Sequence, residues 1–143
     1  MTKYYTAEKM ILLDSSFLVA VEVATDQNHE YAIKLMDKII NGEFGDAIIS
    51  DYIFDETISV TFNKTKALSK AILVGESLNK SCNLLKVSEV IFNKSWETFK
   101  KQKNKKLSFT DCTNLALMKE HNIKYIANFD KEFTKVKEIK VVN

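Results

Sequence analysis

The sequence has no proline and only three glycines in 143 residues. Both residue types mark turns, so their scarcity disfavours a loop-rich or all-β chain. The glycines stand at positions 42, 45 and 75, and this spacing permits neither the dinucleotide-binding pattern GxGxxG nor a P-loop. Nucleotide binding by either of these glycine-rich loops is therefore excluded.

Cysteine is almost as scarce. The two cysteines, Cys82 and Cys112, have no metal-type spacing, which rules out a disulfide framework and a zinc finger or ribbon. Two free thiols suit a reducing cytosol. The apolar stretch 10–23 is interrupted by Asp14 and Glu22 and is too short to span a membrane. These features predict a soluble, cytoplasmic protein.

The remaining composition is that of an ordinary globular protein, with 45% apolar and 28% charged residues. The length predicts a single domain over 1–143. Lys and Arg number 21 against 19 Asp and Glu, giving a net charge of +2. That total does not by itself indicate a nucleic-acid partner, although local charge can.

Short apolar runs alternate with longer amphipathic ones. The runs predict strands over 10–13, 47–50, 84–87, 125–128 and 139–142. The periodicity predicts helices over 15–24, 28–40, 51–63, 66–79, 88–103 and 108–121. Strands separated by helices need crossover connections. The predicted fold is a three-layer α/β/α sandwich around a mostly parallel sheet of about five strands.

Acidic residues recur where these strands end. In open parallel sheets, ligands bind outside the carboxyl ends of the strands. Asp14 directly follows the first strand, and Asp130 follows the fourth. Asp111 lies in the first turn of the helix that leads into the fourth strand. The helix after the second strand carries Asp51, Asp55 and Glu56, and periodicity does not choose between Asp55 and Glu56.

Each acid also has a structural interpretation. Asp14 fits the N-cap of the helix that follows it, and Asp130 fits the cap of a turn. Asp111 fits the capping pattern Ser108-x-x-Asp111. On a helical wheel, however, Asp111 lies on the apolar face, where an unpaired carboxylate is costly. It therefore needs a cation, a donor or a proton.

Carboxylates gathered at one edge repel each other unless some are protonated or a cation neutralises them. An all-oxygen site favours a hard ion, Mg²⁺ or Mn²⁺. The two histidines, His29 and His121, are expected on the solvated surface and do not support a zinc site.

Four segments in chain order resemble the PIN-domain ribonucleases, including the VapC-type toxins. They are Ile11-Leu-Leu-Asp-Ser-Ser16, Ile49-Ser-Asp-Tyr-Ile-Phe-Asp-Glu-Thr57, Leu107-Ser-Phe-Thr-Asp-Cys112 and Ala127-Asn-Phe-Asp-Lys-Glu-Phe133. The resemblance is collinear from Met10 onward, so residues 1–9 form an N-terminal extension. It implies an α/β/α sheet whose acids hold Mg²⁺ or Mn²⁺ and hydrolyse RNA phosphodiester bonds.

The resemblance also implies residue roles. It matches Asp14, Glu56, Asp111 and Asp130 to the acidic catalytic and metal-binding set, and so favours Glu56 over Asp55. Ser15 or Ser16 matches the hydroxyl after the first acid, and Thr110 matches the small residue before the third. Asp130 falls at the most variable of the four positions.

A lysine-rich run precedes Asp111. It is either a solvated helix end and loop or a rim that binds the RNA backbone without regard to sequence. Lys64, Lys66 and Lys70 are further candidates for that rim. Tyr52 and Trp96 are either core or interface residues or surfaces for base stacking. The lysines of the run are Lys100, Lys101, Lys103, Lys105 and Lys106.

The resemblance predicts a divalent-metal-dependent endoribonuclease, with the toxin of a toxin–antitoxin pair as one form. RNA, a second copy of the chain and an antitoxin protein are its expected partners. The alternative is a PIN-fold RNA-binding or RNA-processing scaffold with little activity, or one held inactive by a partner. A phosphotransfer receiver fits poorly because Leu13 stands where a paired acid is needed, and Ser16 breaks the Asp-x-Asp of a haloacid-dehalogenase-type phosphatase.

Overall fold

The computed structural model describes residues 9–143. It contains a five-stranded, wholly parallel sheet with helices on both sides, which confirms the predicted α/β/α fold. The strands are β1 (Met10–Leu13), β2 (Asp46–Ser50), β3 (Asn83–Leu85), β4 (Tyr125–Ala127) and β5 (Lys140–Val142). The helices are α1 (Ser15–Glu22), α2 (His29–Ile40), α3 (Asp51–Thr65), α4 (Leu68–Ser81), α5 (Glu89–Lys100) and α6 (Phe109–Glu120), with a 3₁₀ turn η1 (Phe133–Lys135).

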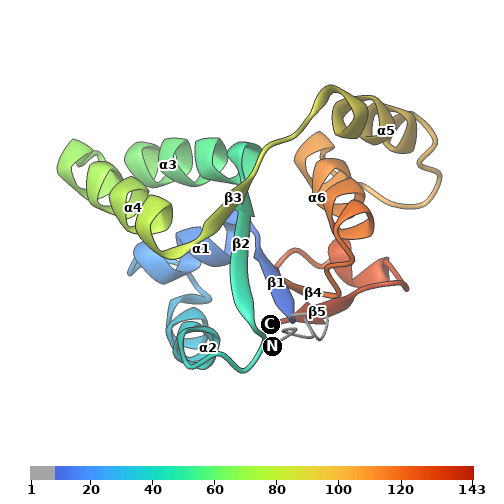
Figure 1. Ribbon diagram of the computed structural model, residues 1–143. Coiled ribbons are helices and arrows are strands. Elements are labelled where there is room, and N and C mark those ends of the chain that lie inside the picture. The colour runs from blue at the N-terminus through green and yellow to red at the C-terminus, as the bar shows by residue number, and fades with distance from the viewer. Residues whose placement is uncertain (1–8) are drawn as a thin grey trace, which may run out of the picture.

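The strand order is β3-β2-β1-β4-β5, so β1 is central. The chain builds outward from β1 through β2 to β3, then returns to the other side of β1 for β4 and β5. Helices α1 to α4 lie on one side of the sheet and α5 and α6 on the other (Figure 1). In this topology a crevice forms at the carboxyl end of the central strand, where the direction of winding reverses.

Strand register brings two sequence-distant segments together at that crevice. Leu13 pairs with Ala127, the last residue of β4. The backbone N–H of Asp14 extends this ladder by donating to the carbonyl of Ala127 at 3.0 Å. Asp14 and the segment that begins at Asn128 therefore leave the sheet side by side.

Serine caps start three of the helices at defined points. The side chains of Ser50, Ser88 and Ser108 each accept a hydrogen bond from the backbone N–H three residues further on. Such caps satisfy a donor that has no partner within the helix. They fix where α3, α5 and α6 begin, and α3 and α6 each carry one of the predicted site acids.

Hydrophobic burial along β1 centres the core under the crevice. Ile11, Leu12 and Leu13 are at most 1% exposed. Phe133 in η1 is fully buried as well, although its segment was expected to be only a turn. Burial of this ring ties the segment after β4 to the core.

The end of α5 differs from the prediction of a helix to residue 103. The helix ends at Lys100, and Gln102 instead holds the following loop. Its side chain accepts from the N–H of Leu107 at 2.8 Å and donates to the Leu107 carbonyl at 3.0 Å. These two bonds draw the chain out of the helix toward the start of α6.

His29 was expected on the solvated surface, and that expectation was wrong. The side chain is half-buried, with Nδ1 2.7 Å from the carbonyl oxygen of Ala20, so it links α2 to α1. His121 is exposed at the end of α6, as expected. Within residues 9–143, no helix combines the length and apolarity that crossing a membrane requires.

Candidate active site

Asp14 occupies the end of the central strand and is held from two sides. Its Oδ2 accepts from the backbone N–H of Ser16 at 3.0 Å and from the Ser16 hydroxyl at 2.7 Å. Its Oδ1 accepts from the side-chain amide of Asn114 at 3.0 Å. With 4% of its surface exposed, the carboxylate is nearly enclosed. It caps α1, as the structural interpretation predicted, and it also faces the crevice.

Asp111, like Asp14, both caps a helix and is buried. It forms a capping box with Ser108: its Oδ2 accepts from the Ser108 N–H at 2.9 Å, and its own N–H donates to Ser108 Oγ at 3.1 Å. The side chain is only 6% exposed, as its place on the apolar face predicted. The capping box therefore fixes the direction in which this buried acid points.

The three acids of α3, Asp51, Asp55 and Glu56, have different surroundings. Asp51 is structural: its Oδ1 accepts from the N–H of Val87 at 2.9 Å and so ties the start of α3 to the segment after β3. Asp55 is exposed and does not line the crevice, whereas Glu56 does. Of the three acids, the structure thus brings only Glu56 to the site, and not Asp51 or Asp55.

Asp130 is more exposed than Asp14 and Asp111. Its Oδ1 accepts from the N–H of Glu132 at 2.9 Å, which is the predicted turn cap. Its own N–H donates to the side-chain oxygen of Asn128 at 2.6 Å. The turn is held on a buried asparagine, and the carboxylate remains at the mouth of the crevice.

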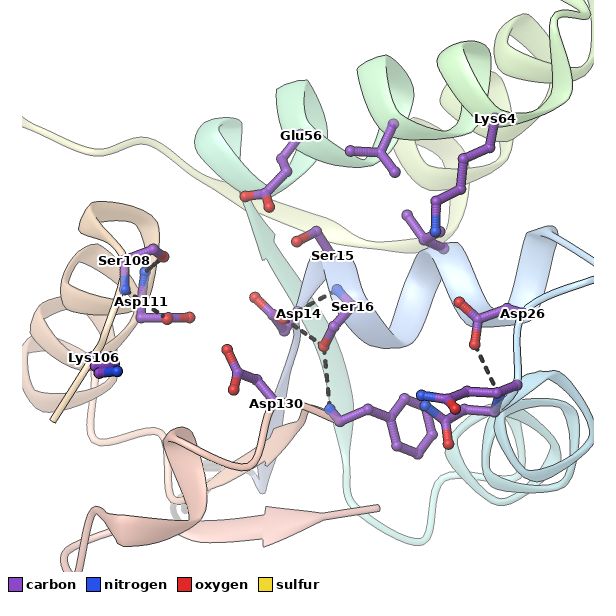
Figure 2. Close-up of a pocket in the computed structure, with 15 residues that line it drawn as sticks. Asp14, Ser15, Ser16, Asp26, Glu56, Lys64, Lys106, Ser108, Asp111 and Asp130 are labelled. Atoms are coloured by element: carbon purple, nitrogen blue, oxygen red, sulfur yellow. Dashed lines mark hydrogen bonds between the residues drawn. The ribbon is translucent and has the colours of Figure 1, made fainter.

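The four acids line one pocket of about 410 Å³. Figure 2 shows Glu56 descending from α3, Asp111 reaching across from α6, and Asp14 and Asp130 rising from the ends of β1 and β4 toward a shared space. Ser15 and Ser16 also line this pocket. Residues spread over most of the sequence therefore converge, as the strand-end argument predicted.

Electrostatics in the pocket disfavour negative charge. Burial, together with the nearby carboxylates of Asp14 and Asp130, raises the pKa of Asp111 to about 6. Burial also raises the pKa of Asp14, against the effect of its Ser16 and Asn114 donors. The pKa of Glu56 is raised by burial and by the charge of Asp14, while the hydroxyls of Ser15 and Thr110 act in the opposite direction. A bound cation would relieve this repulsion.

The donor set suits a hard divalent cation because all four side chains offer carboxylate oxygens. In the part of the chain that the structure describes, no three His, Cys, Asp or Glu side chains stand close enough together to form a ready metal cluster. A cation bound there would have to draw the acids together or take water as its remaining ligands.

The lysine run divides into two groups. Lys106 lines the pocket. Lys100 and Lys101 instead lie near Glu97, at 2.8 and 4.0 Å, and Lys100 also sits over the ring of Trp96 at 5.8 Å from its centroid. Lys103 and Lys105 are exposed and do not line the pocket.

The aromatic candidates belong to one cluster around Phe109. Tyr52 from α3 and Trp96 from α5 have ring centroids 6.3 and 6.4 Å from that of Phe109. Phe92 and Phe99 of α5 complete the cluster at 5.2 and 6.3 Å. Trp96 is 48% exposed, so the cluster is a partly open apolar surface beside α6.

Sequence reasoning missed three residues of the site. Asn114 and Asn128 are fully buried, and they hold Asp14 and the Asp130 turn. Asn114 could have been found, since an asparagine three residues after Asp111 lies on the same buried face of α6. Phe129 also lines the pocket, and in the sequence it stands out only as one residue of the segment 127–133.

Comparison with known proteins bears on the fold. The family model of the PIN domain matches residues 11–139. None of the curated proteins matches the chain in sequence. Among solved structures, VapC20 of Mycobacterium tuberculosis, a sarcin–ricin loop cleaving toxin, superposes with a TM-score of 0.80 at 22% identity, covering 92% of this chain and 98% of its own.

Two further structures are complexes. VapBC2 from Rickettsia felis, bound to a DNA fragment from its promoter, gives a TM-score of 0.67 at 14% identity, covering 94% of this chain and 98% of its own. A toxin–antitoxin complex from Klebsiella pneumoniae gives 0.65 at 17% identity, covering 93% and 96%. At these identities the likeness concerns the fold.

Proposed function

The chain belongs to the PIN-domain family, and from that premise we propose that it is a divalent-metal-dependent endoribonuclease. The observation that carries the proposal is the convergence of Asp14, Glu56, Asp111 and Asp130 on one pocket at the carboxyl end of the central strand. Like charges gathered in one pocket, with Asp14 and Asp111 buried among them, are costly to maintain. Its presence is accounted for if the acids hold Mg²⁺ or Mn²⁺.

In this proposal the four acids are the catalytic and metal-holding residues. Asp14 and Asp111 are the most fixed, since their hydrogen bonds to Ser16, Asn114 and Ser108 set their orientation before any ligand arrives. When bound, the cation supplies Lewis acidity, which lowers the pKa of a water and stabilises charge on the phosphate. Glu56 and Asp130, which are more exposed, are free to adjust to it.

We assign the hydroxyls and the lysines different parts in binding. Ser16 bonds both Asp14 and the N–H of Phe129, so it orients the site. Ser15 and Thr110 act on Glu56 in the same way. Lys106 is the member of the lysine run placed to meet an RNA phosphate at the pocket, while Lys100, Lys101, Lys103 and Lys105 would meet the strand further away.

We also propose a protein partner that silences the nuclease, as an antitoxin does. Two solved structures of this fold are toxin–antitoxin complexes. On α3 and α4, Phe62, Leu68, Ile72 and Leu73 are between 45% and 68% exposed, which leaves an apolar surface on the side of α1 to α4. Exposed apolar patches of this kind mark interaction sites. A homodimer remains a prediction that light scattering in solution can check.

The decisive experiment is an RNA cleavage assay with structured and single-stranded substrates in Mn²⁺, Mg²⁺ or EDTA. Asp111→Asn, prepared identically, is the control for contaminating nucleases. Cutting that needs metal and is lost in Asp111→Asn is the expected result. Equal cutting by both proteins, or none by folded wild-type protein, would favour the alternative of an RNA-binding scaffold with little activity.

A further inference from the structure

The pocket extends well past the four acids. On the side away from Asp111 it is lined by the loop between α1 and α2, through Asp26, Gln27 and Asn28. Lys64 of α3 lines the same end, and Figure 2 shows it reaching down from that helix on the side where Asp26 lies. Lys64 stands eight residues after Glu56, about 12 Å further along the helix axis. The catalytic proposal uses none of these groups.

Polar atoms at this end are available to a ligand. Asp26 Oδ1 accepts from the N–H of Asn28 at 2.8 Å, and its second oxygen has no partner within residues 9–143. Lys64 Nζ likewise makes no ion pair or hydrogen bond in the described part of the chain, whereas Lys66 and Lys70 bond Asn63 and Glu22. An acceptor and a cation are thus both free at one end of the pocket.

An aromatic residue is also part of the pocket lining. Phe129 is half-buried and lines the pocket. One side of its ring leans on Phe17, with centroids 6.0 Å apart. Its backbone N–H donates to Ser16 Oγ at 3.1 Å, the same hydroxyl that bonds Asp14. The backbone of Phe129 is therefore anchored to the hydroxyl that also orients Asp14.

We propose that this end of the pocket is a nucleotide subsite for a base next to the scissile phosphate. The base stacks on Phe129 and presents its edge to Asp26, Gln27 and Asn28. Lys64 holds a neighbouring phosphate. The inference rests on the proposed function and adds to it a preferred substrate. The pocket of about 410 Å³ that these residues share with the four acids has room for an unpaired nucleotide. Splayed-out bases stacked on aromatic rings and bonded at their edges are the usual mode of RNA sequence recognition.

The negative charge of Asp26 determines which bases the subsite prefers. A carboxylate accepts hydrogen bonds and cannot donate them. It therefore favours a base with an exocyclic amino group, namely cytosine, adenine or guanine. Uracil has a single edge N–H flanked by two carbonyl oxygens, which a carboxylate repels. The subsite should discriminate against uracil.

The test is cleavage of a randomised single-stranded RNA library, with the ends sequenced to give base frequencies around each cut. Wild-type protein should make about five- to tenfold fewer cuts with uracil at one position beside the scissile bond. Asp26→Asn should relax that preference at that position alone. Asp37→Asn, which makes the same change on the exposed face of α2, should leave it intact.

A second measurement is independent of catalysis. Metal-free protein is titrated with the dinucleotides CpC and UpU while amide resonances are followed by NMR. CpC should shift the resonances of residues 26–28 and 129 more than UpU does, and Asp26→Asn should make the two alike. Equal shifts, or none, would overturn the subsite.

The two proposals fail differently. Metal-dependent cutting that is lost in Asp111→Asn, but has the same base frequencies in wild type and Asp26→Asn, would overturn the subsite and leave the nuclease standing. An absence of metal-dependent cutting would overturn the nuclease, and the dinucleotide titration would then decide the subsite alone.

Discussion

Asn114 donates its side-chain amide to Oδ1 of Asp14 at 3.0 Å, with both residues buried. The two residues are 100 positions apart in the chain, and the bond joins α6 to the end of β1. Asp111 lies on the same helix, one turn before Asn114. This one contact therefore fixes the distance between the helix that carries one acid and the strand that carries another.

Replacing Asn114 should weaken the site without unfolding the protein. Asn114→Ala removes the donor to Asp14, which further favours the protonated acid and lets its carboxylate rotate. Loss of a partner that orients a metal ligand typically lowers metal affinity or activity 10- to 100-fold, and we expect an effect of about that size on RNA cleavage. Asn93→Ala, on the exposed side of α5, is the matched control. Wild-type cleavage by Asn114→Ala, at equal helicity by circular dichroism, would contradict this role.

The raised pKa of Asp111 predicts an unusual dependence of stability on pH. Its folded-state pKa is about 6, against an ordinary value of 3.8, so between these limits the folded state binds the proton more tightly than the unfolded state does. The free energy of unfolding of metal-free protein should therefore rise as the pH falls from 7 to 5, by about 1.3 kcal/mol from Asp111 alone.

Calorimetry in EDTA across that range measures the effect. Asp14 and Glu56 act in the same direction because their pKa values are also raised. Asp111→Asn should be more stable than wild type at pH 7 and should show a flatter profile. A wild-type melting temperature that falls steadily from pH 7 to pH 5 would count against the buried, repelling carboxylates described here.

Divalent cations should stabilise the protein, and more strongly at higher pH. A ligand that binds only the folded state adds about 2.7 kcal/mol at 100 times its dissociation constant. Protons compete for Asp111 near pH 6, so Mn²⁺ should raise the melting temperature more at pH 7.5 than at pH 5.5. Removal with EDTA should reverse the gain. A shift of the same size in Asp111→Asn would place the cation elsewhere.

The sequence predicted the structure well wherever a local pattern determines it. Apolar runs located all five strands, and burial on both faces accounts for the continuous hydrophobicity of the central strand β1. Serines before amphipathic segments located the starts of α5 and α6. The strand ends then gave the positions of Asp14, Asp111 and Asp130.

Residues whose role depends on a distant partner could not be predicted. His29 looked like a surface residue because nothing local reveals that Ala20 presents a carbonyl to it. Periodicity could not choose between Asp55 and Glu56, which lie on opposite borders of the apolar face, because the choice depends on the rotation of α3 against the sheet. The family resemblance, and not the helical wheel, predicted Glu56. Only the packed structure shows that Lys100 and Lys106, from one basic run, face different surroundings.

Two glycines with the same backbone conformation should respond very differently to substitution. Gly42 and Gly45 both have φ of +82°, which costs an alanine about 1–2 kcal/mol. A Cβ on Gly42 meets nothing, whereas one on Gly45 would collide with the carbonyl of Lys9. That carbonyl accepts from the N–H of Asp46 at 3.0 Å, where β1 and β2 begin to pair.

Gly45→Ala should therefore lower the free energy of unfolding by about 3 kcal/mol or more, and Gly42→Ala by only the backbone strain. Urea denaturation of the two variants beside wild type makes the comparison. Equal losses would mean that the approach of Lys9 to Gly45 does not constrain the start of the sheet.

The lysine run should divide functionally as it divides in space. Lys106 lines the pocket, as Figure 2 shows, whereas Lys101 lies near Glu97, at 4.0 Å. Each lysine that neutralises a phosphate of a single strand contributes about 0.7 to the slope of log affinity against log salt. Lys106→Ala should lower both RNA affinity and that slope, while Lys101→Ala should lower both much less, because Glu97 already partly neutralises Lys101. Binding of a fluorescent single-stranded RNA to metal-free protein, from 50 to 300 mM salt, measures both quantities without catalysis. If the two variants lose the same slope, the strand is held by the whole basic loop, and the pocket does not select Lys106.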